Sequence, residues 1–91
     1  MGYPRTLKVS LSEYGYSMEV DTRKSDCNRE SAHWHLCHRG SRIGQISVYG
    51  TWTSTPSVSS SIRKEAESLT SSYCREIEDC YAYNRENGSD Y

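Results

Sequence analysis

The sequence lacks phenylalanine altogether and has only four residues each of valine, leucine and isoleucine. Its 91 residues allow one domain, and two tryptophans and eight tyrosines must supply much of the core volume. No apolar run approaches the length that crosses a membrane, and the N-terminus has no signal-peptide core. We therefore expect a cytoplasmic protein whose four cysteines are free thiols rather than a disulfide framework.

Several catalytic signatures are also missing. The chain has no glycine-rich phosphate loop, no Gly-x-Ser-x-Gly and no His-Glu-x-x-His. These absences argue against an enzyme of ordinary metabolism, and we expect no cofactor. The net charge is −1, but residues 1–64 carry nine Lys or Arg against five Asp or Glu, whereas residues 65–91 carry two against seven. This asymmetry suits an acidic partner or a nucleic acid on the first part, and head-to-tail self-association equally well.

Two-residue alternation predicts a first hairpin. Apolar and polar side chains alternate over residues 6–13 and again over residues 16–22, which is the period of a strand with one buried face. A two-residue turn at positions 14–15 would pair these strands and set Lys8 opposite Asp21.

A second hairpin is predicted after a polar loop at residues 22–31. Alternation over residues 32–38 and 43–50 indicates two more strands, joined by a three-residue loop at positions 40–42 that would pair Leu36 with Ile46. Ile43 breaks the alternation, which predicts a β-bulge beside the glycine that follows it.

The C-terminal third predicts one long amphipathic helix over about residues 56–86, because apolar residues recur there every three or four positions. Together with the hairpins it defines the expected fold. This is a single α+β domain over residues 1–91, with a four-stranded antiparallel sheet in ββββα order and the helix packed on one face.

The predicted helix is longer than the sheet it covers. Thirty helical residues span about 45 Å, whereas an eight-residue strand spans about 27 Å. The helix is therefore expected either to bend near residues 70–72 or to project its last turns. In the second case Ile77, Tyr81 and Tyr83 would be available to a partner, because aromatic residues are enriched in interfaces.

The run His33-x-His35-x-Cys37 lies on the sheet face that the helix would leave open. Zinc could be held by these three residues with Cys27 as a fourth ligand. Alternatively, the two histidines with Tyr49 could perform acid–base chemistry on RNA. The third interpretation is a solvated or partner-covered polar strand, since antiparallel sheets often leave one face in water.

Nucleic-acid binding is a further hypothesis for the same part of the chain. Arg39 and Arg42 flank the predicted second turn, and Tyr49 and Trp52 are near enough in sequence to stack on bases. The alternative is that these loop cations serve only solubility, and the net acidity of the whole chain favours that alternative.

The stretch Ala32-His33-Trp34-His35, with the turn, strand and helix that follow, resembles a small uncharacterised bacterial domain family built around a Pro-His-x-His strand. The resemblance covers about residues 27–86, with His33 and His35 matching the motif and Ala32 standing in place of proline. That family is associated with toxin–antitoxin and mobile-element modules. The resemblance therefore implies a small protein of a bacterium, phage or mobile element, without supplying a mechanism.

We interpret the sequence as a small non-enzymatic binding or regulatory protein that acts by protein–protein contact. An inhibitor of a host or defence protein, such as an anti-CRISPR, or an antitoxin-like module would fit. The alternatives are an RNA-binding or RNA-cleaving toxin-like protein and a zinc-stabilised module. No membrane partner is expected, and a homodimer through the helix end is a further alternative. The residues predicted to bind are His33, His35, Arg39, Arg42, Gln45, Tyr49, Trp52, Ile77, Tyr81 and Tyr83.

Overall fold

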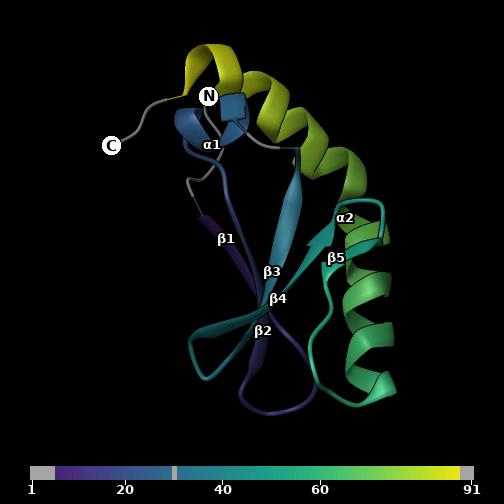
Figure 1. The fold of residues 1–91 in the computed structure, drawn as a ribbon. Coiled ribbons are helices and arrows are strands. Elements are labelled where there is room, and N and C mark those ends of the chain that lie inside the picture. Colours follow the sequence, from purple (N-terminus) through teal and green to yellow (C-terminus); the bar gives the residue numbers. More distant parts are fainter. Residues whose placement is uncertain (1–5, 30, 89–91) are drawn as a thin grey trace.

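The computed structural model describes residues 6–29 and 31–88. The elements, in chain order (Figure 1), are β1 (Thr6–Ser10), β2 (Tyr16–Asp21), α1 (Lys24–Arg29), β3 (His33–His38), β4 (Ser41–Ser47), β5 (Trp52–Ser54) and α2 (Ser60–Asn87). The strands form one antiparallel sheet in the order β1-β2-β3-β4-β5. No helix in the described ranges is long and apolar enough to cross a membrane.

The predicted α+β class, with an antiparallel sheet and a long C-terminal helix, is confirmed. The predicted strand number is wrong, because the sheet has five strands and not four. The additional strand β5 is only three residues long and lies in a serine- and threonine-rich connection. Such a short strand has too few positions for alternation to mark it.

The first hairpin has the predicted faces but a different register. Lys8 lies opposite Glu19 and not opposite Asp21, and the N–H of Leu11 donates to the carbonyl of Tyr16 at 3.0 Å. The loop therefore holds the four residues between Leu11 and Tyr16, and the predicted two-residue turn is wrong. A shift of two positions leaves every side chain on its original face, so hydrophobic alternation cannot detect it.

The predicted bulge in the second hairpin is confirmed. Leu36 pairs with Gly44, whereas the next residue, Cys37, pairs with Arg42. Ile43 is therefore the extra residue on β4, beside Gly44 as the broken alternation indicates. The bulge sets Arg42 opposite Cys37, on the face that carries the predicted site.

The turn of this hairpin is tight, and it moves the predicted strand bounds. The residues at positions 39–40 both have positive φ, 51° and 85°, which suits a two-residue hairpin turn. The predicted three-residue loop at positions 40–42 is therefore wrong, and Leu36 pairs with Gly44 instead of Ile46. β4 consequently begins at Ser41, earlier than predicted. It ends at Ser47 because the chain turns there, with the N–H of Gly50 donating to the Ser47 carbonyl at 3.0 Å.

α2 begins at Ser60, later than the predicted start at residue 56. Pro56 is buried and packs against the sheet instead of opening the helix. A β-carbon added at Gly44 would lie 3.0 Å from Cδ of Pro56, so this glycine provides the space into which the proline fits.

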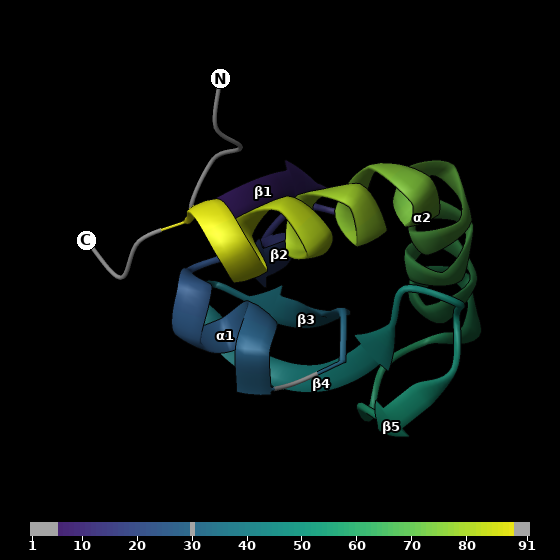
Figure 2. The ribbon, with the colours of Figure 1, turned by 90° about the horizontal axis from the view of Figure 1, so that it is seen from above.

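α2 is continuous over 28 residues and bends, as one of the two expectations had it. Figures 1 and 2 show its second half running in a different direction from its first. Two hydroxyls next to the bend donate to backbone carbonyls of the preceding turn, Thr70 to Glu67 at 2.7 Å and Ser72 to Ser68 at 3.2 Å. Hydroxyls that bond back in this way often bend helices.

The end of α2 does not project, because α1 lies beneath it. The Asn84 amide donates to the Thr22 carbonyl at 2.7 Å, and Nε of Arg85 donates to the Cys27 carbonyl at 3.1 Å. Ile77 and Tyr81, predicted as accessible, are only 2% and 3% exposed. The predicted polar loop at 22–31 thus contains a short helix that extends the surface α2 packs on.

The core lies between α2 and the face of the sheet that α2 covers. It is built from Leu11, Met18, Val20, Trp34, Leu36, Ile46 and Val48 of the sheet and its loops, Cys27 of α1, and Ile62, Ala66, Ile77 and Tyr81 of α2. On β2, β3 and β4 these residues alternate with polar side chains, which therefore point to the opposite face.

Candidate binding surface

The face of the sheet opposite α2 is called here the outer face. Its residues are Lys8 and Ser10 of β1, Ser17, Glu19 and Asp21 of β2, His33, His35 and Cys37 of β3, and Arg42, Gln45 and Ser47 of β4. All of these side chains are polar or ionisable. Most are exposed or half-buried, with Ser17 and Cys37 as the buried exceptions.

Arg42 organises the outer face. Its Nε donates to Glu19 Oε1 at 2.9 Å, and its second guanidinium nitrogen donates to Asp21 Oδ2 at 2.5 Å. Both carboxylates belong to β2, whereas Arg42 belongs to β4, so the side chain crosses β3, which lies between them. Cys37, the cross-strand partner of Arg42 on this intervening strand, is buried and only 1% exposed.

The bridge sets the charge state of its members. Burial alone would raise the pKa of Asp21, but the hydrogen bond and charge of Arg42, assisted by Thr6 and Arg23, hold that pKa below its usual value. The carboxylate is therefore ionised at neutral pH. Arg42 is 45% exposed and each carboxylate 22% exposed, so solvent screens the pair and its contribution to stability is small.

His33 and His35 lie in contact on the same face. Their ring centroids are 4.9 Å apart in an edge-on arrangement. Nδ1 of His33 lies 2.7 Å from the Ser31 carbonyl oxygen. A carbonyl oxygen can only accept a hydrogen bond, so Nδ1 is the donor, and in the neutral ring it carries the hydrogen. Burial, then the charges of Arg42 and His33, lower the pKa of His35, and its ring is therefore mainly neutral at pH 7.

A polar cleft of about 220 Å³ opens at the end of the outer face, where α1 begins. Five residues predicted to bind line it: His33, His35, Arg42, Gln45 and Tyr81. Tyr81 reaches the cleft from the core, and its hydroxyl donates to the Asp21 carbonyl at 3.2 Å. The alternation on β3 and β4 therefore identified residues that share one cleft.

The other predicted binding residues lie elsewhere. The Tyr49 hydroxyl donates to Glu78 on α2, and the indole of Trp52 donates to Glu67 at 2.8 Å. Arg39 is exposed at the hairpin turn, Ile77 is in the core, and Tyr83 is half-buried near the end of α2. Tyr49 is therefore engaged by α2 and is not among the residues of the cleft, which separates it from the two histidines of the proposed acid–base set.

The four predicted zinc ligands do not converge. Cys27 belongs to the core cluster beneath α2, whereas Cys37 is on the outer face. Burial, with a smaller effect of Cys80, raises the pKa of Cys27 to about 11, so its thiol is protonated at neutral pH. Within residues 6–29 and 31–88, no three His, Cys, Asp or Glu side chains are grouped as a metal ion requires.

The predicted binding set leaves out four residues around this surface: Glu19, Asp21, Arg23 and Asp26. Alternation does place Glu19 and Asp21 on this face, and Arg23 is one of the loop cations of the nucleic-acid hypothesis. Arg23 and Asp26 form an ion pair at 3.0 Å, and the Arg23 N–H also donates to that carboxylate at 3.2 Å. An acid three residues after the N-cap residue can accept a hydrogen bond from the N-cap N–H, and Asp26 has that place relative to Arg23, just before α1. This signal was available in the sequence, whereas the cross-sheet partners of Arg42 were not.

No family model matches the sequence, and no curated protein or solved structure was found to be similar to it. The resemblance to the Pro-His-x-His family consequently stays a prediction.

Proposed function

We propose that this chain is a small non-enzymatic binding module that contacts a protein partner through its outer face. The observation that carries the proposal is the Arg42 bridge across three strands. It orders the polar side chains of an accessible face before any partner arrives. Ordering in advance lowers the entropic cost of association, because fewer rotamers are lost when the partner binds.

The same pairing favours a protein over a phosphate-bearing partner. Arg42 is engaged by two carboxylates and Arg23 by Asp26, so the arginines at the cleft bring no excess positive charge. Phosphate recognition relies on cationic side chains whose charge is available to the ligand. A protein partner can instead add hydrogen bonds to His33, His35 and Gln45 at the rim of the bridge. The RNA-acting interpretation is the second candidate, favoured only by the contact between the two histidines.

The test is capture from bacterial lysates with the tagged full chain and two variants. We expect at least one protein to be retained by the wild type and by Lys64→Ala, a control on the exposed surface of α2. The double variant His35→Ala/Gln45→Ala should retain about tenfold less of that protein. Equal retention by the double variant, or no protein that distinguishes the variants, would contradict the proposal.

A parallel measurement addresses RNA. We expect the wild-type chain to leave a mixed RNA substrate intact. Cleavage that is present in the wild type and absent from His33→Ala/His35→Ala would replace the binding-module proposal with the RNA-cleaving one. The double variant rules out a contaminating nuclease, because contamination would not follow the two histidines.

A further inference from the structure

β1 is an edge strand, and one of its two edges is unpaired. It pairs with β2 on one side, and no strand of the described ranges lies on its other side. Because the N–H of Leu11 donates to the Tyr16 carbonyl, Leu11 directs its backbone groups toward β2, and so do the alternate residues Leu7 and Val9. The N–H and C=O groups of Thr6, Lys8 and Ser10 therefore point away from the sheet.

α2 marks where this free edge ends. The next outward-pointing N–H belongs to Ser12, and it donates to Glu65 Oε2 at 2.9 Å, while the Ser12 hydroxyl donates to Oε1 at 2.7 Å. A carboxylate of α2 thus occupies the position that a paired strand would otherwise fill. The opposite edge, β5, has only three residues, which is one way in which proteins protect an edge from pairing. β1, with five residues, is not shortened in this way.

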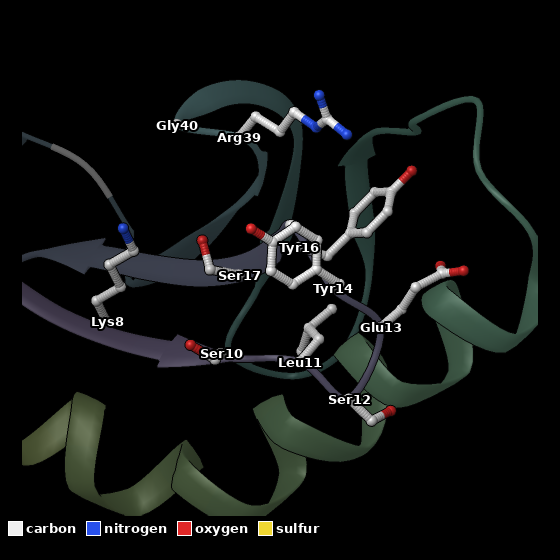
Figure 3. A pocket seen from close by; sticks show the side chains of 11 residues that line it. Lys8, Ser10, Leu11, Ser12, Glu13, Tyr14, Tyr16, Ser17, Arg39 and Gly40 are labelled. Atoms are coloured by element: carbon white, nitrogen blue, oxygen red, sulfur yellow. The ribbon is translucent and has the colours of Figure 1, made fainter.

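An open groove of about 760 Å³ borders β1 and the two hairpin tips (Figure 3). Lys8 and Ser17 rise from the strands on the side away from α2, and Arg39 lies at the far end near Tyr16. The charged residues of the groove are Lys8, Arg39 and Glu13, a net excess of one positive charge. Within residues 6–29 and 31–88, neither Lys8 nor Arg39 forms an ion pair, because Glu19, which lies opposite Lys8 on β2, is bonded to Arg42.

We infer that β1 accepts an extended segment of the partner protein as a sixth strand, with an acidic residue of that segment facing Lys8. This inference rests on the proposed function, since it supposes a protein partner. Side chains alternate along the added strand, so its acidic or polar residues would lie on the face of the sheet that carries Lys8. The intervening residues would be apolar, beside the half-buried Leu7 and Val9.

A second copy of this chain fits the edge poorly. The antiparallel self-pairing that uses all three outward residues is centred on Lys8, and it sets Thr6 opposite Ser10. That arrangement puts Lys8 directly opposite Lys8, and like charges in opposed positions destabilise a strand pair. A lysine on an edge strand is a known device against self-association. An acidic residue on a partner segment would instead form a favourable charge pair with Lys8.

The probe is a displayed library of random twelve-residue peptides selected against the full chain. We expect enrichment of sequences in which acidic and apolar residues alternate. One enriched peptide is then synthesised, and its affinity is measured by fluorescence anisotropy. Ser10→Pro removes one outward N–H and should weaken binding about tenfold, whereas Ser10→Ala keeps the N–H and should change it less than about twofold. Lys8→Glu should also weaken binding about tenfold, and Lys64→Glu, the matched charge reversal on α2, should not.

A readout without substitution guards against misfolding of the proline variant. Saturation with the peptide should slow amide hydrogen exchange at Thr6, Lys8 and Ser10, whose amides are otherwise open to solvent. Failure to enrich alternating acidic peptides, or equal affinity for Ser10→Pro, would overturn the inference. Peptides that bind Ser10→Pro normally but lose affinity for His35→Ala/Gln45→Ala would place the partner on the outer face, which leaves the proposed function intact. Self-association abolished by Ser10→Pro would show that the edge takes a second copy instead.

Discussion

The two faces of the sheet share the same strands but are held together by different forces. On β3, Trp34 and Leu36 are completely buried, whereas the alternating neighbours His33 and His35 are partly exposed. The inner face, which α2 covers, is held by apolar contacts with that helix. On the outer face, Arg42 links two carboxylates across an intervening strand.

This difference separates stability from recognition. Burial of large apolar side chains contributes kilocalories per residue, whereas partly exposed ion pairs contribute about 1 kcal/mol or less. Residues of the outer face can therefore be replaced with little effect on folding, which makes that face available for binding. The predictions below test whether the division between the two faces is as sharp as the structure indicates.

The largest difference between the faces is expected on adjacent residues of β3. Trp34→Ala should lower the free energy of unfolding by about 3–5 kcal/mol, because it leaves a large cavity in a completely buried site. His33→Ala on the other face should change it by less than about 0.5 kcal/mol. Urea denaturation followed by circular dichroism measures both values. Comparable losses from the two substitutions would show that the outer face also carries the fold.

The next contrast lies on adjacent residues of β4. Gly44→Ala places a methyl group 3.0 Å from Cδ of Pro56 and 3.1 Å from the backbone oxygen of Ser54, which forces a shift in the packing. We expect a loss of about 1–3 kcal/mol. Gln45→Ala on the outer face should cost less than about 0.5 kcal/mol. Thermal and urea denaturation measure both values. If the free energy of unfolding of Gly44→Ala equals that of the wild type within error, Pro56 does not depend on the space that this glycine provides.

The sequence was sufficient to assign these faces because a period of two survives errors in register. Alternation correctly separated Trp34 from its histidine neighbours, and a single break in it located the bulge at Ile43. It could not fix the pairing of Lys8, because a shift of two residues leaves the pattern unchanged. The short α1 was missed because its stability comes from contacts with the end of α2, 50 or more residues away in sequence.

The site was only partly predictable for the same reason. His33 and His35 were found from their own strand, since one element determines which way they point. The role of Arg42 depends on the strand order and on the bulge that sets it opposite Cys37. Ile77 and Tyr81 were expected at a projecting helix end because the platform formed by α1 was not foreseen.

The Arg42 bridge should show the salt dependence that the inner face lacks. Arg42→Met should lower the free energy of unfolding by about 1 kcal/mol or less at low salt, and the difference should shrink in about 1 M salt. The control is Arg39→Met, which removes an exposed arginine without such a bridge. The folded-state pKa of Asp21 is lowered, so its contribution is present above the unfolded-state pKa and is lost as pH falls through the folded one. Carbon-detected NMR titration should show that the pKa of Asp21 rises in Arg42→Met, where only Thr6 and Arg23 still oppose the effect of burial. An unchanged pKa would show that the bridge is not what lowers it.

The smallest effect concerns His35, a half-buried residue of the outer face. Its folded-state pKa lies below the ordinary value of 6.5, so the unfolded chain binds the proton more tightly. The free energy of unfolding should therefore fall as pH drops below about 6.5, by less than about 1 kcal/mol per pH unit. His35→Gln should flatten this part of the pH profile, whereas His38→Gln, on the same strand, should retain the slope. A slope that persists in His35→Gln would mean that another group carries it, and the outer face would then be less closely packed around His35 than its contacts with Arg42 and His33 indicate.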